Sequence, residues 1–316
     1  MKKLETELKI IKETGTPDVA SLYIGEFEKG KLVEFVESVH PPRNEKFTKV
    51  VFIISTLNGC PVGCRFCDAS GYYKGKLTKD EMFAQIDFLA KKRFKSGVID
   101  VEKFKIQFSR MGEPALNPSV LEVLEELPAR YPAPGLLVSL STIAPIGSEK
   151  FFTKLLDVKN KLYKTNFQLQ FSIHTTDLSY RKWLIPVSTW SMEQIAAYGN
   201  SFYCPEGKKI TLNFALDKKA PLDVSKLLKH FNPEKFLIKI TPINPTYKAY
   251  ENDIASLIKP EKTDYEIVQN LQKAGYQVIV SVGDLEENSI GSNCGQYLMK
   301  HLIALKKLKD DYTNEC

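Results

Sequence analysis

The sequence has little that would direct it to a membrane or a secretory pathway. No uninterrupted apolar run among its 316 residues approaches the length of a membrane span, and residues 1–3 lead into a mixed polar segment rather than the core of a signal peptide. Three of its six cysteines, Cys204, Cys294 and Cys316, are scattered, which does not suggest a disulfide framework. We therefore expect a cytoplasmic protein without a membrane partner.

The sequence also lacks a long repeat, a low-complexity linker and a single basic tract of the kind that marks a nucleic-acid arm. Its net charge of +6 is compatible with an anionic partner such as RNA, but charge alone favours a lysine-rich solvated surface. A hydrophobic content of 43% and a charged content of 26% are ordinary for a globular protein, and the length allows one large α/β domain or two smaller ones.

Half of the cysteines lie in one segment, residues 58–67, with the sequence NGCPVGCRFC. Cys60, Cys64 and Cys67 follow a C-x3-C-x2-C spacing. Three thiolates this close can hold three corners of a [4Fe-4S] cluster, which ordinarily takes four cysteine ligands, so one iron would stay open. The best-known occupant of such an iron is S-adenosylmethionine (SAM), whose reductive cleavage gives a 5′-deoxyadenosyl radical.

Two other interpretations of this segment are weaker. A zinc site needs a fourth soft or imidazole ligand at finger spacing, and no histidine lies between His40 and His174. Three structural cysteines within ten residues, two of them beside glycine, would be an unusual core. The context also fits a cluster loop, because residues 49–55 predict a buried strand and residues 78–81 form a capping box that opens a helix.

The rest of the chain predicts two regions. Residues 1–48 are expected to form a small N-terminal extension with a hairpin of strands at 20–27 and 32–39. From residue 49 to 316, strands and helices alternate as in parallel βα units, which predicts an α/β fold with an open or partial barrel. After residues 49–55, the expected strands are 103–108, 136–140, 167–173, 209–215, 236–240 and 277–281. Three helices are expected to start at Asn117-Pro118 and at capping boxes at 191–194 and 263–266.

Chemistry in such a fold is expected on the loops at the carboxyl ends of the strands. The first of these turns contains Gly112 and Glu113; the glycine permits close backbone approach to a ligand, and the carboxylate can accept from an ammonium group. Taken alone, this Gly-Glu-Pro triplet is a common turn. A second turn contains Ser141, whose hydroxyl could contact a ribose or a carboxylate but could equally mark a strand end.

Two further turns carry polar side chains. The third contains Ser172 and His174; a histidine in such a place is ordinarily hydrogen-bonded in or near the core. The fourth contains Asn244, which is either a turn residue or a partner for the edge of an adenosine.

Taken in order, these pieces resemble the radical SAM methyl synthases RlmN and Cfr, which methylate an adenine of large-subunit rRNA. The cysteine segment is similar to the family's cluster loop. The four turns, MGEPALN, ST, SIH and TPIN, are similar to its SAM-binding segments, and residues 292–297, SNCGQY, resemble its A-C-G-Q-L motif. The resemblance runs from about residue 37 to 297.

The resemblance implies a partial (β/α)6-type radical SAM barrel followed by a cysteine-bearing loop and a tail helix. It implies a [4Fe-4S] cluster and SAM as cofactors and an electron donor such as flavodoxin or ferredoxin. Cys294 would be the methyl carrier, which requires a reachable thiolate rather than an inert buried thiol. Glu37 resembles an acidic residue of the family thought to assist proton handling.

Three features depart from that family. Its second cysteine, which releases the product by pairing with the carrier, is replaced by Ile53, and Cys204 or Cys316 would have to substitute. The short N-terminal extension stands in place of the family's larger RNA-binding domain. The arginine-rich stretch ahead of the carrier reads SVGDLEE at 281–287, and such an acidic loop argues against a polyphosphate substrate.

We therefore expect a methyl-synthase-like radical SAM enzyme that uses Cys294 as carrier on an unidentified substrate, which is a small molecule, a peptide or RNA. One alternative is direct hydrogen abstraction from a small molecule or peptide, with Cys294 unmethylated. A second is methylation of an adenine in rRNA or tRNA. The weakest alternative is a binding module stabilised by a cluster or by zinc.

Overall fold

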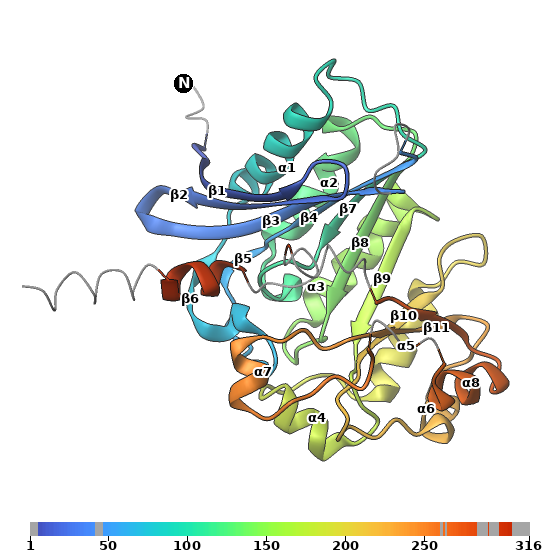
Figure 1. Ribbon diagram of the computed structural model, residues 1–316. Coiled ribbons are helices and arrows are strands. Elements are labelled where there is room, and N and C mark those ends of the chain that lie inside the picture. The colour runs from blue at the N-terminus through green and yellow to red at the C-terminus, as the bar shows by residue number, and fades with distance from the viewer. Residues whose placement is uncertain are drawn as a thin grey trace, which may run out of the picture.

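The computed structural model describes residues 6–41, 47–259, 262, 264–282, 290 and 297–304. Its main feature is one ten-stranded sheet, in which the strands lie side by side in the order of their numbers (Figure 1). Those strands are β1 (Lys9–Thr16), β2 (Ala20–Phe27), β3 (Lys31–His40), β4 (Lys49–Ile54), β7 (Lys103–Phe108), β8 (Leu136–Thr142), β9 (Phe167–Ser172), β10 (Ile210–Ala215), β11 (Phe236–Thr241) and β12 (Gln277–Val280). From β4 to β12 all neighbours are parallel, whereas β1 to β4 pair antiparallel.

Helices connect the parallel strands. They are α1 (Lys79–Arg93), α2 (Ser119–Arg130), α3 (Glu149–Val158), α4 (Leu178–Leu184), α5 (Met192–Phe202), α6 (Val224–His230), α7 (Tyr247–Glu251) and α8 (Glu266–Lys273). A small separate sheet pairs β5 (Leu57–Gly59) with β6 (Tyr73–Lys76) around the cysteine segment. Residues 297–304 are helical as well and lie near β5 and β6 (Figure 1). None of the described helices is long and apolar enough to cross a membrane.

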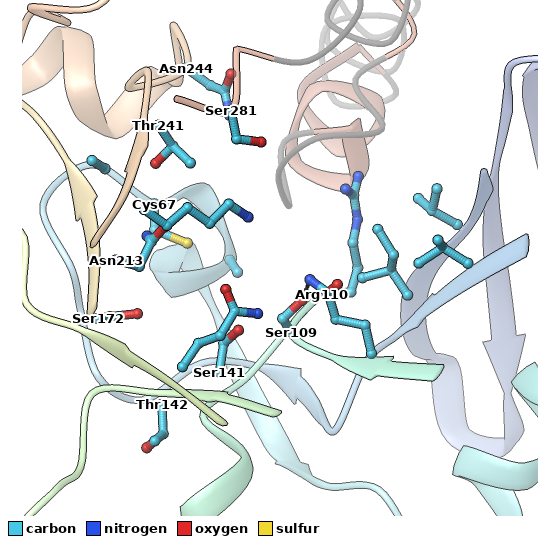
Figure 2. A pocket seen from close by; sticks show the side chains of 18 of the residues that line it. Cys67, Ser109, Arg110, Ser141, Thr142, Ser172, Asn213, Thr241, Asn244 and Ser281 are labelled. Atoms are coloured by element: carbon cyan, nitrogen blue, oxygen red, sulfur yellow. Dashed lines mark hydrogen bonds between the residues drawn. The ribbon is translucent and has the colours of Figure 1, made fainter. Parts of the chain in front are cut away.

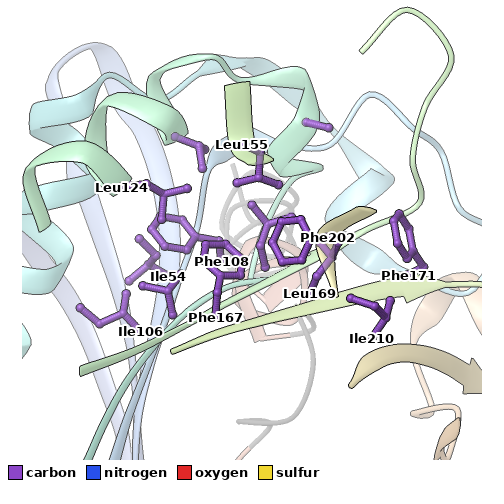
Figure 3. Close-up of a cluster of buried hydrophobic side chains, with 14 of the residues drawn as sticks. Ile54, Ile106, Phe108, Leu124, Leu155, Phe167, Leu169, Phe171, Phe202 and Ile210 are labelled. Atoms are coloured by element: carbon purple, nitrogen blue, oxygen red, sulfur yellow. The ribbon is translucent and has the colours of Figure 1, made fainter. Parts of the chain in front are cut away.

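The parallel strands have two chemically different faces. In β7, Phe104, Ile106 and Phe108 are buried in the hydrophobic core, while Lys105 and Gln107 between them line a cavity. Parallel strands that are covered on both faces are apolar nearly throughout. The alternation here therefore leaves one face of the sheet for polar ligands and the other for helices. Figure 3 shows the apolar face, where strand side chains such as Phe108 and Leu169 pack near helix residues such as Leu124 and Phe202.

The expected core strands and the α/β class are confirmed, with strand ends that shift by no more than two residues. The sheet continues across the predicted boundary at residue 48, because β3 pairs with β4 with Val36 opposite Ile53. The division into two regions at that point stays a prediction. β1 had no counterpart among the expected strands; its side chains are half-buried or exposed, so its sequence carries little apolar alternation.

Two helix starts differ from expectation. α2 begins at Ser119, and Asn117 bonds the backbone carbonyls of Thr56 and Leu77 through its amide, at 2.8 Å each, in addition to accepting from the Ser119 amide. The expected start at 263–266 is wrong for α8, which begins at Glu266 after an N-cap without a side-chain bond. The hydroxyl of the N-cap residue, Tyr265, bonds the backbone of Lys259 instead, which holds this residue outside the helix.

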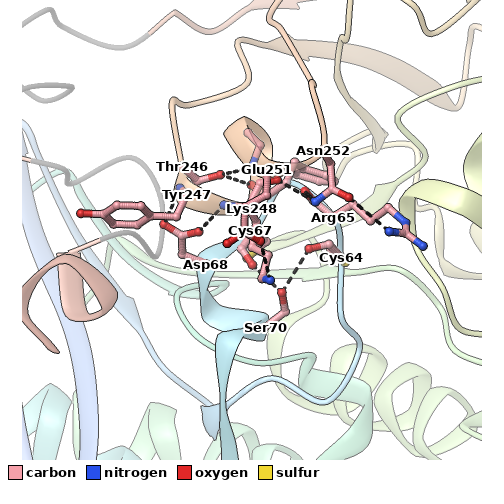
Figure 4. Close-up of polar contacts among 12 residues, drawn as sticks. Cys64, Arg65, Cys67, Asp68, Ser70, Thr246, Tyr247, Lys248, Glu251 and Asn252 are labelled. Carbon is pink, nitrogen blue, oxygen red and sulfur yellow. Dashed lines mark hydrogen bonds and ion pairs between the residues drawn. The ribbon is translucent and has the colours of Figure 1, made fainter. Parts of the chain in front are cut away.

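The cysteine segment is tied to α7, which lies 180 residues further along the chain (Figure 4). The buried carboxylate of Asp68 accepts from the amides of Tyr247 and Lys248 at 3.1 and 2.9 Å, and the Thr246 hydroxyl donates to the Phe66 carbonyl at 2.9 Å. These amides open α7, where the unpaired N–H groups of a helix favour an anion. The contacts therefore fix the cysteine segment against the end of β11.

We expect Asp68→Ala to lower the free energy of unfolding by about 2 kcal/mol, because two amides in a buried setting lose their acceptor. The matched control is Glu125→Ala, since Glu125 forms a surface ion pair with Lys154 that is worth no more than about 1 kcal/mol. Urea denaturation of both variants measures the difference. Equal losses in the two would show that Asp68 does not anchor the segment.

Candidate active site

The polar face of the sheet encloses a cavity of about 730 Å³ (Figure 2). It is lined by residues from β3, β4 and β7 to β11, and by the turns that follow several of these strands. Figure 2 shows Ser141, Ser172 and Asn213 from neighbouring strands together with Cys67 and Asn244 from loops. A volume of this size is typical of small-molecule and cofactor sites.

Cys60, Cys64 and Cys67 are free thiols and all line this cavity. Among the described residues, no three potential ligands surround a point where one metal ion could sit. Three thiolates at one cavity could hold three corners of a [4Fe-4S] cluster. Burial raises the pKa of the Cys60 thiol to about 11 and that of Cys64 still further. Both thiolates therefore need a cationic partner, which fits an iron-sulfur cluster.

Backbone geometry positions these thiols. The amide of Cys60 donates to the Tyr72 carbonyl at 3.1 Å, and the Ser70 hydroxyl donates to the carbonyls of Cys64 and Cys67. Gly59 has a φ of 77°, and a Cβ there would lie 1.8 Å from the Tyr72 carbonyl oxygen. Only glycine fits this turn.

The turn after β7 places Glu113 at the cavity in a fixed orientation. One carboxylate oxygen accepts from the Thr142 hydroxyl at 2.5 Å and the Ala115 amide at 3.0 Å, and the other accepts from the Ile143 amide at 2.9 Å. Burial raises the pKa of Glu113 to about 7. Since a carboxylate offers about four acceptor positions, one remains for a ligand such as an ammonium group.

Gly112 also lines the cavity, and its close contact with Leu57 explains why this position is a glycine. Its φ is 98°, and a Cβ there would lie 2.5 Å from the Leu57 Cβ and 2.8 Å from the Leu57 amide nitrogen. The residue is therefore required for packing against β5, in addition to any approach by a ligand.

His174 is buried and neutral at the end of β9. Its Nδ1 accepts from the Ala215 amide at 3.1 Å, so its proton is on Nε2. Its ring packs edge-to-face on Phe66 of the cysteine segment, with centroids 5.0 Å apart. Burial and the nearby Arg181 lower the pKa of His174 to about 3. The side chain is hydrogen-bonded in the core and also lines the cavity, and its part in binding SAM stays a prediction.

The structure brings all nine of the expected cofactor and metal residues to this one cavity. Its lining includes Cys60, Cys64, Cys67, Gly112, Glu113, Ser141, Ser172, His174 and Asn244. The parallel strands explain this convergence, since their carboxyl ends meet at one edge of the sheet. The assignment of each residue to the cluster or to SAM stays a prediction.

Glu37 is not brought to the cavity. Along β3, Val36 and Ser38 line it, so the intervening Glu37 points to the opposite face of the sheet. There its carboxylate forms an ion pair with Arg93 at the end of α1. This placement favours a role in holding α1 over the proton handling expected from the resemblance.

The remaining cysteines differ in position. Cys204 follows α5 and precedes β10, which puts it at the amino-terminal edge of the sheet, opposite the cysteine segment. It therefore does not replace the family's second cysteine. Cys294 and Cys316 lie outside the described residues. Ile53, which the resemblance puts at the position of that second cysteine, lines the cavity.

Two buried arginines were missed by sequence reasoning. Arg181 of α4 donates to the carbonyls of Ser172 and Ile173 at 3.2 Å each and thereby fixes the end of β9. Arg110 lines the cavity and forms a 2.7 Å ion pair with the fully buried Glu34 of β3. Arg181 stands in no local motif. Arg110 belongs to the first turn, but nothing in the sequence near it indicates that it pairs with Glu34 of a distant strand.

Comparison with known proteins agrees with this geometry. The profile of the radical SAM superfamily matches residues 54–192. A probable dual-specificity RNA methyltransferase RlmN from Chlorobium phaeobacteroides is 29% identical over 84% of this chain and 71% of its own length. A second protein of that name, from Thermotoga neapolitana, is 26% identical over 91% of this chain and 78% of its own.

A crystal structure of a radical SAM methyltransferase from Sphaerobacter thermophilus has the same fold. It superimposes with a TM-score of 0.67 at 19% identity, over 92% of this chain and 81% of the other. The radical SAM superfamily implies a [4Fe-4S] cluster and SAM. The chain is therefore an enzyme of the radical SAM methyltransferase type that resembles RlmN and Cfr.

Proposed function

We propose that this protein is a methyl synthase in which Cys60, Cys64 and Cys67 hold a [4Fe-4S] cluster and Cys294 carries a methyl group to the substrate. When bound, the cluster and SAM supply the methyl group and the radical that activates it. The protein binds SAM through the turns that contain Gly112, Glu113, Ser141, Ser172, His174 and Asn244.

The proposed role of Cys294 is supported by the positions of the described residues on either side of it in the sequence. Ile290 and Leu298 belong to one hydrophobic cluster, against which Cys60 and Cys67 pack. Residues 290 and 298, on either side of the proposed carrier in the sequence, thus belong to a cluster beside the cysteine segment, which supports the choice of Cys294 as carrier.

Two more contacts fix the helix that follows Cys294. The Leu298 amide donates to the Glu34 carboxylate at 2.9 Å, and Glu34 in turn is paired with Arg110 at the cavity. The side chain of Met299 approaches Gly71, with its Cε 3.1 Å from the position that a Cβ would take. Ser281 and Val282, before the carrier segment, line the cavity as well. Both ends of the segment thus support a carrier at the cavity.

In the first step, the Cys294 thiolate would attack the sulfonium methyl carbon of SAM. A bond between sulfur and carbon forms, the bond from the sulfonium to the methyl group breaks, and S-adenosylhomocysteine leaves. Glu113 orients the donor through its free acceptor position, and His174 presents its Nε2 proton as a hydrogen-bond donor. The relatives are RNA methyltransferases by name, which makes an adenine in RNA one candidate substrate. A flavodoxin or ferredoxin would supply the electron.

Cys64→Ser should lose most of the iron that the wild-type protein takes up on anaerobic reconstitution, because a cluster loses one of its three protein ligands. The matched control is Cys204→Ser, which removes a thiol far from the cavity and should keep wild-type iron. Iron per chain is measured directly. A Cys64 variant that binds iron at the wild-type level would exclude the proposed ligand set.

Intact-protein and peptide mass spectrometry of the reconstituted wild-type protein, supplied with SAM and reductant, should show a methyl group on Cys294. Cys294→Ala should lose it, and Cys204→Ser should retain it. If SAM is cleaved while Cys294 stays unmodified, the enzyme abstracts hydrogen directly from its substrate and the carrier role is wrong.

Ile53→Cys should form a disulfide with Cys294 under mild oxidation, because Ile53 packs against the cluster that contains Ile290 and Leu298. A disulfide requires Cα atoms within about 7 Å. Val51→Cys, two residues earlier on β4 and also at the cavity, is the positional control and should cross-link less. Peptide mapping identifies the pair. A free thiol at position 53, with Cys294 also free, would contradict the proximity of the carrier to this strand.

A further inference from the structure

Glu34 of β3 is a fully buried carboxylate to which the proposed function gives no role of its own. One of its oxygens forms a 2.7 Å ion pair with the Arg110 Nε at the cavity (Figure 2). The other oxygen accepts from the Leu298 amide at 2.9 Å. Leu298 belongs to the helical residues 297–304, which follow the proposed carrier Cys294 in the sequence and are called the 297–304 helix below. One side chain therefore joins the cavity to this helix.

The backbone of Glu34 is fixed to the turn that follows β7. Its amide contacts the Met111 Sδ at 3.3 Å, and its carbonyl accepts from the Ser55 hydroxyl at 2.5 Å. The Ser55 oxygen in turn accepts from the Met111 amide at 3.2 Å. Arg110 and Met111 directly precede the part of this turn, with Glu113, that is proposed to bind SAM. Main-chain and side-chain contacts together thus fix Glu34 relative to that turn.

The surroundings of this carboxylate are otherwise apolar. Leu298 lies in one hydrophobic cluster with Val36 of β3 and Ile24 of β2. Burial raises the pKa of the Glu34 carboxyl, while Arg110 and the Leu298 amide oppose this rise. A buried ion pair is often no more stabilising than apolar side chains of similar volume, but it can fix one register between packed elements. Stability alone therefore does not explain a carboxylate at this position.

We propose that Glu34 is a positioning residue of the methyl-transfer site, whose carboxylate sets the place of the 297–304 helix relative to the turn proposed to bind SAM. This inference rests on the proposed function, in which the Cys294 thiolate attacks the sulfonium methyl carbon of SAM. Such an attack needs the sulfur, the methyl carbon and the leaving sulfonium nearly in line, and a misplacement of about 1 Å can slow a reaction about 100-fold. Glu34 acts through Leu298 rather than on the reacting atoms.

Glu34 should affect the carrier more than it affects SAM binding. The Glu113 carboxylate is held by hydrogen bonds of its own from Thr142 and Ile143. The cysteine segment is tied to α7 by separate contacts. Both stay in place when the Glu34 carboxylate is removed. The maximal rate of Cys294 methylation is therefore expected to fall, with little change in the SAM concentration that gives half of that rate.

Two double variants isolate the contact with Leu298. Glu34→Met/Arg110→Met removes both charges, and Glu34→Gln/Arg110→Met also removes them but keeps an oxygen that can accept from the Leu298 amide. Because both partners of the ion pair are removed together, neither variant leaves a buried charge, and both should melt close to the wild-type temperature. The matched control is Lys31→Met, which breaks another ion pair of β3, with Glu81, and should methylate at the wild-type rate.

Single-turnover methylation of Cys294 is followed by mass spectrometry on reconstituted full-length protein that starts unmodified at this residue. At saturating SAM, the Glu34→Met double variant should react about 10- to 100-fold more slowly than wild type, while the half-maximal SAM concentration changes by less than about twofold. The Glu34→Gln double variant should recover most of the rate. Hydrogen exchange in peptides from 297–304 should be faster with methionine than with glutamine at position 34, because the helix loses a contact with the sheet.

Glu34→Asp tests the same contact in a variant that keeps a charge beside Arg110 and so avoids an unpaired buried cation. Its carboxylate is one methylene shorter and cannot reach both Arg110 and the Leu298 amide as Glu34 does. Methylation should be slower than in wild type, and exchange in the 297–304 helix should be faster.

Equal methylation rates in the two double variants would overturn the positioning role. So would slow methylation with unchanged exchange at 297–304, or a raised half-maximal SAM concentration without a lower maximal rate, which would assign the pair to SAM binding. Wild-type protein that never methylates Cys294 would overturn the proposed function itself. Wild-type methylation together with equally fast methylation in the Glu34→Met double variant would overturn only the role of Glu34.

Discussion

The structure depends on strands that are apolar on one face and polar on the other. In β7, Phe104, Ile106 and Phe108 alternate with Lys105 and Gln107, and a strand of this kind is stable only if its two faces meet different surroundings. Helices cover the apolar face and drive folding by burial of large side chains. The polar face remains available, and the parallel direction of the strands brings their terminal turns to one edge of it.

The cysteine segment contributes three thiols to the candidate site at this edge of the sheet. The segment has no regular structure to hold three thiols, so contacts far along the chain fix it. Asp68 and Thr246 join it to α7, and the Arg65 guanidinium donates to Asn252 Oδ1 while Asn252 Nδ2 donates to the Arg65 carbonyl. The helix at residues 297–304 then packs against the other side of the same segment. Three parts of the chain thus meet at the thiols, Ile290 and Leu298 among them.

The cavity combines two kinds of electrostatic environment. Toward the carboxyl ends of the strands, Glu113 and His174 are held by backbone amides, and burial raises the pKa of Glu113 to about 7 and lowers that of His174 to about 3. Nearer the amino-terminal ends of the strands, Lys105 and Lys239 repel each other. The two ends of the cavity therefore differ in their electrostatic environment.

The sequence by itself determined the cysteine spacing, most of the core strands, the α/β class and the turns that line the cavity. These features are local, because apolar alternation, capping boxes and motif spacing depend on residues close together in the chain. Tertiary structure alone decided that Glu37 faces α1, that Cys204 lies at the far edge of the sheet, and that Arg110 pairs with Glu34. It also decided that lysines from β4, β7 and β11 share one cavity. Such contacts join strands that are far apart in sequence, and only the register of the sheet determines which side chains meet.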